Sequence, residues 1–343
     1  MKPSSPTSAV AVAEPAVGHA TADPPRPAPP RPARHPRTRL AAYLRLAKIG
    51  MVDYYLSLLV VASLPPPSGG PAAGASSAMT LGAFLAGELC LVSAAVAFDD
   101  VTGYRDGSDA ANYGTDAAVR RLARKPLLAG TLTEAQALRF GRAALAAGVL
   151  CWAAALALAP HRPMWAVLGV VAAAFLVPQY SWGLRLGHHG FQELFLAAVG
   201  WAFVLPLYGL ATGEATALAA VEAFLFGLGP LLFGVYSNTN DIAGDRAVGR
   251  PTVACLLSRR GNALFIGALS ALETAVIAGA AVLGLAPWWF PLALLPVTAA
   301  RTAQFTVGVL RGDVLRGRLI GIRTHRTLVA VLVAANLLCA GTA

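Results

Sequence analysis

The stretch Tyr236-Ser-Asn-Thr-Asn-Asp-Ile-Ala-Gly-Asp-Arg-Ala-Val-Gly-Arg250 places two carboxylates, Asp241 and Asp245, directly after an apolar run that begins at Phe224. Residues four apart lie on one face of a helix. Like charges at that spacing destabilise a bare helix by a few tenths of a kcal/mol, so we expect a cation between the two groups. Hard oxygen ligands favour Mg²⁺, which commonly uses one or two carboxylates and completes its shell with water and phosphate.

A second acidic cluster, Phe98-Asp-Asp-Val-Thr-Gly-Tyr-Arg-Asp-Gly107, also follows an apolar run. On a helix, Asp99 and Asp106 in this cluster would lie two turns apart on one face. A duplicated unit whose second helix ends in an acidic loop would produce this pattern. Two such loops facing each other could hold two metal ions and one diphosphate.

The composition indicates a membrane protein. A chain of 343 residues with 56% hydrophobic and 13% charged residues has too little polar surface for a soluble globule. Residues 1–38 are rich in Pro, Ala and Arg, cannot form a core, and are expected to be a disordered cytoplasmic tail. Residues 39–343 then form one transmembrane domain.

The apolar runs predict an all-α fold of about nine transmembrane helices. We place these spans near 42–64, 79–98, 136–159, 164–183, 191–211, 216–237, 262–285, 287–309 and 327–342. The loops after the even-numbered spans carry many arginines, whereas the opposite loops carry only Arg162. The positive-inside rule therefore puts the N-terminus and both acidic clusters on the cytoplasmic side of the cell membrane. Two four-helix pseudo-repeats plus one further helix fit this arrangement.

Some basic residues point to anion binding rather than to topology alone. Lys125 stands in Arg124-Lys-Pro-Leu-Leu-Ala-Gly130, shortly after the first acidic cluster. A cation there could grip a diphosphate and stabilise its departing charge. The segment Tyr180-Ser-Trp-Gly-Leu-Arg185, followed by Gly190-Phe-Gln-Glu193, adds a phenol and a guanidinium at the same membrane face. Nucleic-acid binding is disfavoured, because the basic residues follow the topology instead of forming a single patch.

Together these features resemble the UbiA-type intramembrane prenyltransferases, from about Arg39 to the C-terminus. The matching elements are the acidic loop ending in Asp106-Gly107, Lys125-Pro126-Leu127, the segment from Tyr180 to Glu193, and Asn240-Asp-Ile-Ala-Gly-Asp245 with Gly249 and Thr252. The resemblance implies a helical fold around a central cavity open to lipid, and a Mg²⁺-dependent reaction on a polyprenyl diphosphate. By position, it assigns the metal to Asp99, Asp106, Asp241 and Asp245, and the diphosphate to Lys125 and Arg185, with Tyr180 as a helix-four tyrosine.

The first motif departs from the family pattern, which usually reads Asn-Asp-x-x-Asp-x-x-x-Asp. Aligned on Asp106, Phe98 replaces the asparagine and Thr102 replaces the middle aspartate. Asp100 could supply the missing carboxylate, although it lies on a different helical face. The departure bears on the metal geometry of the first motif and on the type of reaction.

The expected mechanism is ionisation of an allylic C1–O bond after metal and cations have neutralised the leaving diphosphate. Arg250 would add to those cations, and Asn240 would lie at the substrate. Tyr180 and Tyr236 could offer aromatic faces to the carbocation. Asp53, a few turns into the first span, could orient an acceptor or take its proton.

Other ionisable residues inside the spans usually face a protein interior. Glu88 could pair across helices as a buried structural acid. Glu273 and Arg301, in the seventh and eighth spans, could pair with each other.

The favoured function is Mg²⁺-dependent transfer of a prenyl group from a polyprenyl diphosphate to an acceptor, expected to be aromatic, within the lipid bilayer. A terpene cyclase on the same scaffold is the enzymatic alternative, since the altered first motif leaves it open. A transporter of small molecules or lipids is the alternative of another class. The acids here cluster at one membrane face rather than at the midplane, which favours an enzyme over a transporter.

Overall fold

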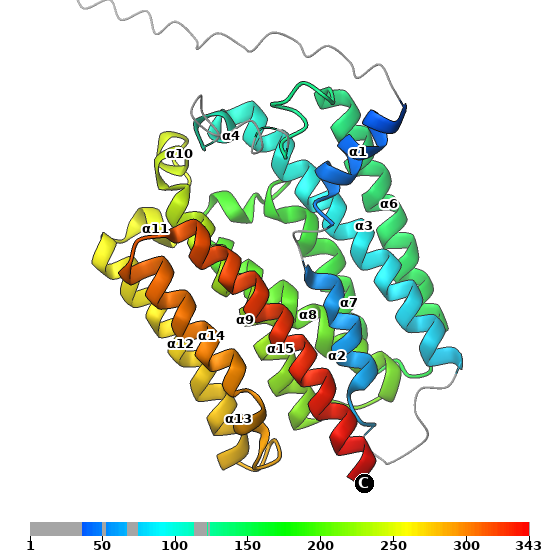
Figure 1. The fold of residues 1–343 in the computed structure, drawn as a ribbon. Helices are drawn as coiled ribbons and strands as arrows, with labels where there is room; N and C mark the ends of the chain where they lie inside the picture. The colour runs from blue at the N-terminus through cyan, green and yellow to red at the C-terminus, as the bar shows by residue number, and fades with distance from the viewer. Residues whose placement is uncertain (1–35, 50–52, 67–74, 113–121, 123, 343) are drawn as a thin grey trace, which may run out of the picture.

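The computed structural model describes residues 36–49, 53–66, 75–112, 122 and 124–342, and these residues form helices and connecting turns without a β-strand (Figure 1). The all-α prediction is therefore confirmed. Residues 1–35, which make up most of the predicted tail, lie outside the described residues.

Six helices in the described part are long and apolar enough to cross a membrane. They are α3 (Ala75–Asp106), α6 (Glu134–Leu158), α8 (Gln192–Thr212), α9 (Ala217–Asn240), α12 (Arg259–Val282) and α15 (Val314–Thr342). They coincide with the second, third, fifth, sixth, seventh and ninth predicted spans. The chain is thus a multi-pass membrane protein.

The other three predicted spans are shorter or interrupted, so the count of nine is not confirmed. The first corresponds to η1 (Asp53–Leu56) and α2 (Ser57–Ser63), and the fourth to α7 (Met164–Leu176) and η2 (Val177–Tyr180). The eighth is divided into α13 (Phe290–Ala293), α14 (Leu295–Phe305) and the π-helical turn η4 (Thr306–Leu310). Prolines near the starts of η2, α13 and α14 favour new helices there, because proline fits the first helical turn but not the interior.

Short helices and one 3₁₀ turn connect or flank the long helices. These are α1 (Pro36–Ala47), α4 (Ser108–Asn112), the turn η3 (Leu186–His188), α10 (Ile242–Ala247) and α11 (Val253–Leu256). Figure 1 shows α4 and α10 at the same end of the molecule, and the two helices contact each other. The segments that follow the two acid-bearing helices, α3 and α9, therefore meet.

Glycines allow the long helices to approach closely. A Cβ atom at Gly200 of α8 would lie 2.6 Å from the Cα atom of Gly227 in α9, so the two backbones touch there. A Cβ at Gly87 of α3 would clash with the indole of Trp152 in α6. The hydrophobic effect does not drive helices together in lipid, so close van der Waals packing at small residues stabilises such crossings instead.

A buried ion pair joins the last third of the bundle. Glu273 of α12 and Arg301 of α14 form a bidentate pair with both N–O distances at 2.7 Å, and their side chains are 0% and 2% exposed. Arg301 also donates to Gln304, which donates in turn to the carbonyl oxygen of Leu232 in α9. The predicted pairing of Glu273 with Arg301 is confirmed.

Candidate active site

The second acidic motif lies where α9 ends and α10 begins. Asp241 is the residue between the two helices, and its carbonyl oxygen accepts a hydrogen bond from the Asp245 amide at 2.9 Å. This hydrogen bond keeps Asp241 and Asp245 about one helical turn apart, although α9 has ended. Asp245 is buried, with 4% of its surface exposed, and Asp241 is half-buried. Asn240 is exposed and donates to the Asp241 carboxylate at 2.8 Å.

The first acidic motif occupies the last two turns of α3. The Ser181 hydroxyl donates to the Asp99 carboxylate at 2.8 Å, which ties α3 to the loop after η2. Asp106, at the end of α3, accepts the amide of Ser108 at 3.0 Å and so starts α4. α4 then brings Asn112 against Gly244 of α10, where a Cβ atom would collide with the Asn112 amide.

Arg250 links the two motifs. Its guanidinium donates to the Tyr180 hydroxyl at 3.0 Å and to the Gly187 carbonyl at 3.1 Å, and lies 3.7 Å from the Asp99 carboxylate. Its amide donates to the carbonyl of Asp245 at 2.8 Å. Burial acts to lower the pKa of Arg250, but the nearby Tyr180, Asp99 and Asp245 outweigh it, so the pKa lies above its ordinary value. Arg250 therefore remains a cation between the acidic clusters.

The four predicted carboxylates share one electrostatic environment. The pKa of Asp245 is raised to about 6: burial is the largest cause, Arg250 opposes it, and Asp241, Asp99 and Asp106 add smaller increases. In the part of the chain that the structure describes, no three His, Cys, Asp or Glu side chains converge on a single metal position. The set instead suits a Mg²⁺ ion held by one or two carboxylates with phosphate and water as its other ligands.

Lys125 lies behind this site, in a second charged cluster. Its ammonium contacts the carboxylates of Asp100 and Asp109, both at 2.7 Å, and Lys48 contacts Asp100 at 2.8 Å. Asp100 is 1% exposed and its carboxylate is paired with both lysines. Both lysines contact Oδ1 of Asp100, whereas Oδ2 is buried and has no hydrogen-bond partner among the described residues. Burial raises the pKa of Asp109 to about 6 despite Lys125.

The two unusual residues of the first motif hold the loop after η2. Thr102 donates to the carbonyl oxygen of Phe98 at 2.9 Å and shares its hydroxyl with the carbonyl oxygen of Ser181 at 3.2 Å. The Phe98 ring packs on Trp182, with centroids 4.6 Å apart. Both residues thus support the segment whose Ser181 binds Asp99, a packing role in place of metal binding.

Three other predicted site residues have different surroundings. Arg185 is exposed on its loop, with a left-handed φ of 51°. Tyr236 is 1% exposed and packs between Gly308 of η4 and Gly317 of α15, so its ring is a core group. Asp53 is fully buried and receives two hydrogen bonds from Arg326 at 2.8 and 2.9 Å. The ion pair ties the start of η1 to α15.

Supporting residues that the sequence reasoning did not single out complete the site. The Glu193 carboxylate accepts from Asn238 at 2.9 Å and from the Val253 amide at 3.1 Å. It thereby fixes the segment that follows Arg250. Ser181 and Glu193 both lie in the quoted segment from Tyr180 to Glu193, so their position in the sequence was a signal, but their polar contacts become evident only in three dimensions.

Comparisons with known proteins give the family and the fold. The sequence model of the UbiA prenyltransferase family matches residues 56–313. A ligand-free UbiA homologue from Aeropyrum pernix K1 superposes with a TM-score of 0.59 at 19% identity, over 88% of this chain and 98% of its own. A UbiA homologue from Archaeoglobus fulgidus bound to DMAPP and Mg²⁺ gives 0.58 at 16% identity, over 85% and 99%. A structure concerned with digeranylgeranylglyceryl phosphate synthase gives 0.56 at 11% identity, over 87% and 99%. No curated protein matches the chain.

Proposed function

The chain belongs to the UbiA prenyltransferase family, and we propose that it transfers a prenyl group from a polyprenyl diphosphate to a lipophilic acceptor within the membrane. The observation that carries the proposal is the contact network of Arg250: its amide donates to the carbonyl oxygen of Asp245 in the second acidic motif at 2.8 Å, and its guanidinium lies 3.7 Å from the carboxylate of Asp99 in the first. Two acidic motifs joined by a cation suit a substrate that carries several negative charges and binds through metal ions.

Homologues support the donor and the metal. The Archaeoglobus fulgidus homologue has been solved with DMAPP and Mg²⁺ and with GPP and Mg²⁺. In this chain Asp99, Asp106, Asp241 and Asp245 would hold Mg²⁺, with one or two of these carboxylates on each ion. A cation there would relieve the repulsion that the other three carboxylates exert on buried Asp245. Bound there, the metal would supply Lewis-acid neutralisation of the diphosphate.

The basic residues of the chain have separate roles in this reaction. Arg250 faces the site and can donate to the diphosphate oxygens as negative charge develops on them. Lys125 and Lys48, held behind α3 by Asp100, raise the positive potential around the same end of the bundle. The C1–O bond of the donor breaks and the diphosphate leaves with the electron pair. A bond then forms between C1 and the acceptor, which loses a proton.

A terpene cyclase remains the second candidate, because one observation favours it. Thr102 and Phe98 replace two motif residues and bind the loop after η2 instead of a metal. In a cyclase the substrate's own double bond attacks the cation, so the product is a hydrocarbon and needs no acceptor.

The test is product formation in membranes that contain the full chain. Geranyl, farnesyl and geranylgeranyl diphosphate would be supplied with Mg²⁺ or EDTA, and with or without phenolic acceptors. A Mg²⁺-dependent prenylated product supports transfer, and a cyclic hydrocarbon formed without acceptor supports the cyclase. Asp241→Ala should abolish either product, whereas Glu214→Ala, at an exposed acid between α8 and α9, should not. Absence of diphosphate release by the folded protein from every donor would contradict both.

A further inference from the structure

The last helix, α15, carries a stripe of exposed residues along its outer side. The helix packs on α9, α14 and α2, and Figure 1 shows α2 beside it. Exposed residues on its remaining side are spaced three or four apart, so they share one helical face. This outer stripe begins with a basic half, Arg316, Leu319, Arg323 and Arg326, and continues with an apolar half, Ala330, Ala334 and Leu337.

The two halves correspond to two levels of a bilayer. α15 has 29 residues and is therefore about 43 Å long. The hydrocarbon core of a bilayer is about 30 Å thick, so about 13 Å of the helix extends beyond it. With the apolar half in the hydrocarbon, the arginines lie at the level of the lipid headgroups or reach that level by snorkelling.

The positive charge of the basic half exceeds that of the nearby acids. Residues 311–326 include five arginines and one acid, Asp313, whose carboxylate accepts the backbone amide of Arg316 at 3.1 Å. In the part of the chain that the structure describes, neither Arg316 nor Arg323 forms an ion pair. Both guanidiniums are therefore open to an anion from outside the chain.

Arg326 is fixed where the two halves of the stripe meet. It forms a bidentate pair with the fully buried Asp53 at 2.8 and 2.9 Å, yet 49% of its side chain remains exposed. An arginine at this depth in a membrane helix is costly unless it has partners. An anionic headgroup is a partner that the bilayer itself supplies.

The helix α2 widens the apolar half. The ion pair at Asp53 and the hydrogen bond from Asn336 to Ser63 both join residues 273 apart in the chain, so α2 and α15 run in parallel. Leu59 and Ala62 of α2 are exposed, and they lie at the level of the apolar half. Two neighbouring helices thus offer apolar surface below the arginines.

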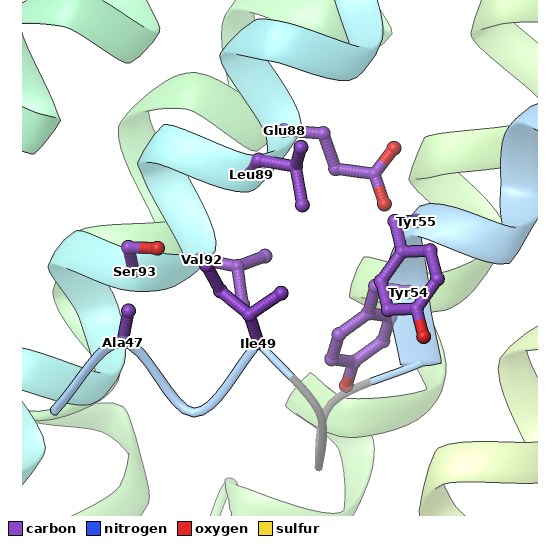
Figure 2. A pocket seen from close by; sticks show the side chains of 8 residues that line it. All are labelled: Ala47, Ile49, Tyr54, Tyr55, Glu88, Leu89, Val92 and Ser93. Atoms are coloured by element: carbon purple, nitrogen blue, oxygen red, sulfur yellow. The ribbon is translucent and has the colours of Figure 1, made fainter. Parts of the chain in front are cut away.

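The other side of η1 and α2 is closed by α3. Figure 2 shows Tyr54 and Tyr55 of η1 opposite Glu88 of α3, and Ser57 of α2 donates to the Glu88 carboxylate at 2.9 Å. The space between α3 and η1 has room for about one water molecule. A lipid chain therefore does not enter there, and lipid reaches these helices on the side of the outer stripe.

We propose that the outer stripe binds an anionic glycerophospholipid. Arg316 and Arg323 are two helical turns apart on one face, so their long side chains converge on a phosphate placed between them and donate charge-assisted hydrogen bonds to it. One acyl chain then lies along the apolar half. Basic sites at the headgroup level of membrane helices bind anionic lipid headgroups in this way.

Other phosphates fit the stripe less well. Inorganic phosphate gains nothing from the apolar half. A polyprenyl diphosphate has a similar head and tail, but its binding through Mg²⁺ needs a carboxylate, and the Asp53 carboxylate beside the stripe is paired with Arg326. A glycerophospholipid needs no metal ion. The proposal is thus independent of the reaction proposed above.

The test is lipid binding to the full chain in detergent, measured by native mass spectrometry. Dioleoyl phosphatidylglycerol and dioleoyl phosphatidylcholine have the same acyl chains and differ in charge. We expect the wild type to bind phosphatidylglycerol at least tenfold more tightly than phosphatidylcholine. Each arginine beside an anionic lipid strengthens binding by about fivefold, so Arg316→Gln with Arg323→Gln should weaken phosphatidylglycerol binding by about 25-fold.

Arg259→Gln with Arg260→Gln is the matched control, because it removes the same charge from two exposed arginines at the start of α12. This variant should keep the wild-type preference. Phosphatidylglycerol should also raise the thermal unfolding temperature of the wild type and the control but not of the stripe variant, whose own unfolding transition shows that it is folded. Equal loss of binding in both double variants would mean that net charge alone attracts the lipid, and would overturn the proposal.

Competition distinguishes the sources of the phosphate group. An equal concentration of inorganic phosphate, or of geranylgeranyl diphosphate without Mg²⁺, should leave phosphatidylglycerol bound. Displacement by inorganic phosphate would reduce the stripe to a simple anion site, and displacement by geranylgeranyl diphosphate would assign it to the prenyl donor. Either result would overturn the phospholipid assignment.

Discussion

Arg250 is the side chain whose removal tests the proposed site most directly. It donates to Tyr180 at 3.0 Å and to Gly187 at 3.1 Å, and it lies 3.7 Å from Asp99. Its side chain is only 13% exposed, so water replaces these contacts poorly. Arg250→Ala would leave Asp99 without its nearest guanidinium and would release the second motif from the loop after η2.

The size of the effect follows from these contacts. Hydrogen bonds from a charged donor contribute about 1.5–3 kcal/mol each. Loss of one preorganised donor to a developing anion lowers kcat by about 10²- to 10³-fold, or about 2.7–4 kcal/mol. Arg250→Lys keeps the charge but not the planar fork that reaches Tyr180 and Gly187 together. We therefore expect an intermediate loss of about tenfold, equivalent to about 1.4 kcal/mol.

The assay is Mg²⁺-dependent release of diphosphate from geranyl diphosphate by the purified chain in nanodiscs, with folding checked by thermal unfolding. Arg246→Ala is the matched control, because Arg246 is an exposed arginine of α10 that bonds to the carbonyl oxygen of Cys255 at 3.2 Å. An Arg250→Ala protein that is folded and keeps the wild-type kcat would refute the role assigned to this guanidinium.

Three further predictions concern stability and packing. Glu273→Gln or Arg301→Met should each lower the free energy of unfolding in detergent by about 3–5 kcal/mol, because each leaves a buried charge without its partner. The double variant Glu273→Leu with Arg301→Met should recover most of this loss. A double variant as unstable as the sum of the single variants would contradict the reasoning. The pKa of Asp109 is about 6 in the folded chain and near 3.9 in the unfolded chain. The contribution of Asp109 to the free energy of unfolding therefore falls by on the order of 2–3 kcal/mol as the pH rises from about 4 to about 6. Asp109→Asn should remove this pH dependence from unfolding curves measured in parallel, and the same pH dependence in both proteins would exclude the assignment. Gly244→Ala should lower kcat because its Cβ meets Asn112, and Asn112→Ala in the same chain should restore activity; no rescue would mean that the contact between α4 and α10 does not position the site.

Much of the architecture could be predicted from the sequence because it depends on local patterns. Long apolar runs predict helices in a membrane, and the acids directly after the runs that end near Phe98 and Tyr236 predict where charge gathers. The pairing of Glu273 with Arg301 was also predictable, since opposite charges at similar depth in neighbouring spans have few other partners. The exact ends and interruptions of the shorter helices depend on prolines and tertiary contacts, and were less predictable.

The orientation of individual side chains could not be predicted in the same way. Asp53 and Arg326 are 273 residues apart in the chain, and the packing against α15 of α2, the helix that follows η1, brings them together. Asp99 and Asp100 are neighbours on α3, yet Asp99 lies nearest to Arg250 and Asp100 pairs with Lys125 and Lys48. Tyr236 resembles an interfacial aromatic in the sequence, but Gly308 and Gly317 leave the space that buries it.

The pair formed by Glu273 and Arg301 also bears on how the protein is made. An arginine at the centre of a lone helix raises the cost of leaving the translocon by about 2.5–3.5 kcal/mol, and a glutamate in a separate helix carries a comparable penalty. With a bidentate contact at 2.7 Å between them, α12 and α14 hide both charges from lipid only as a hairpin. Biogenesis is therefore expected to hold α12 at the translocon until α14 has been synthesised, and to release the two helices into the bilayer together.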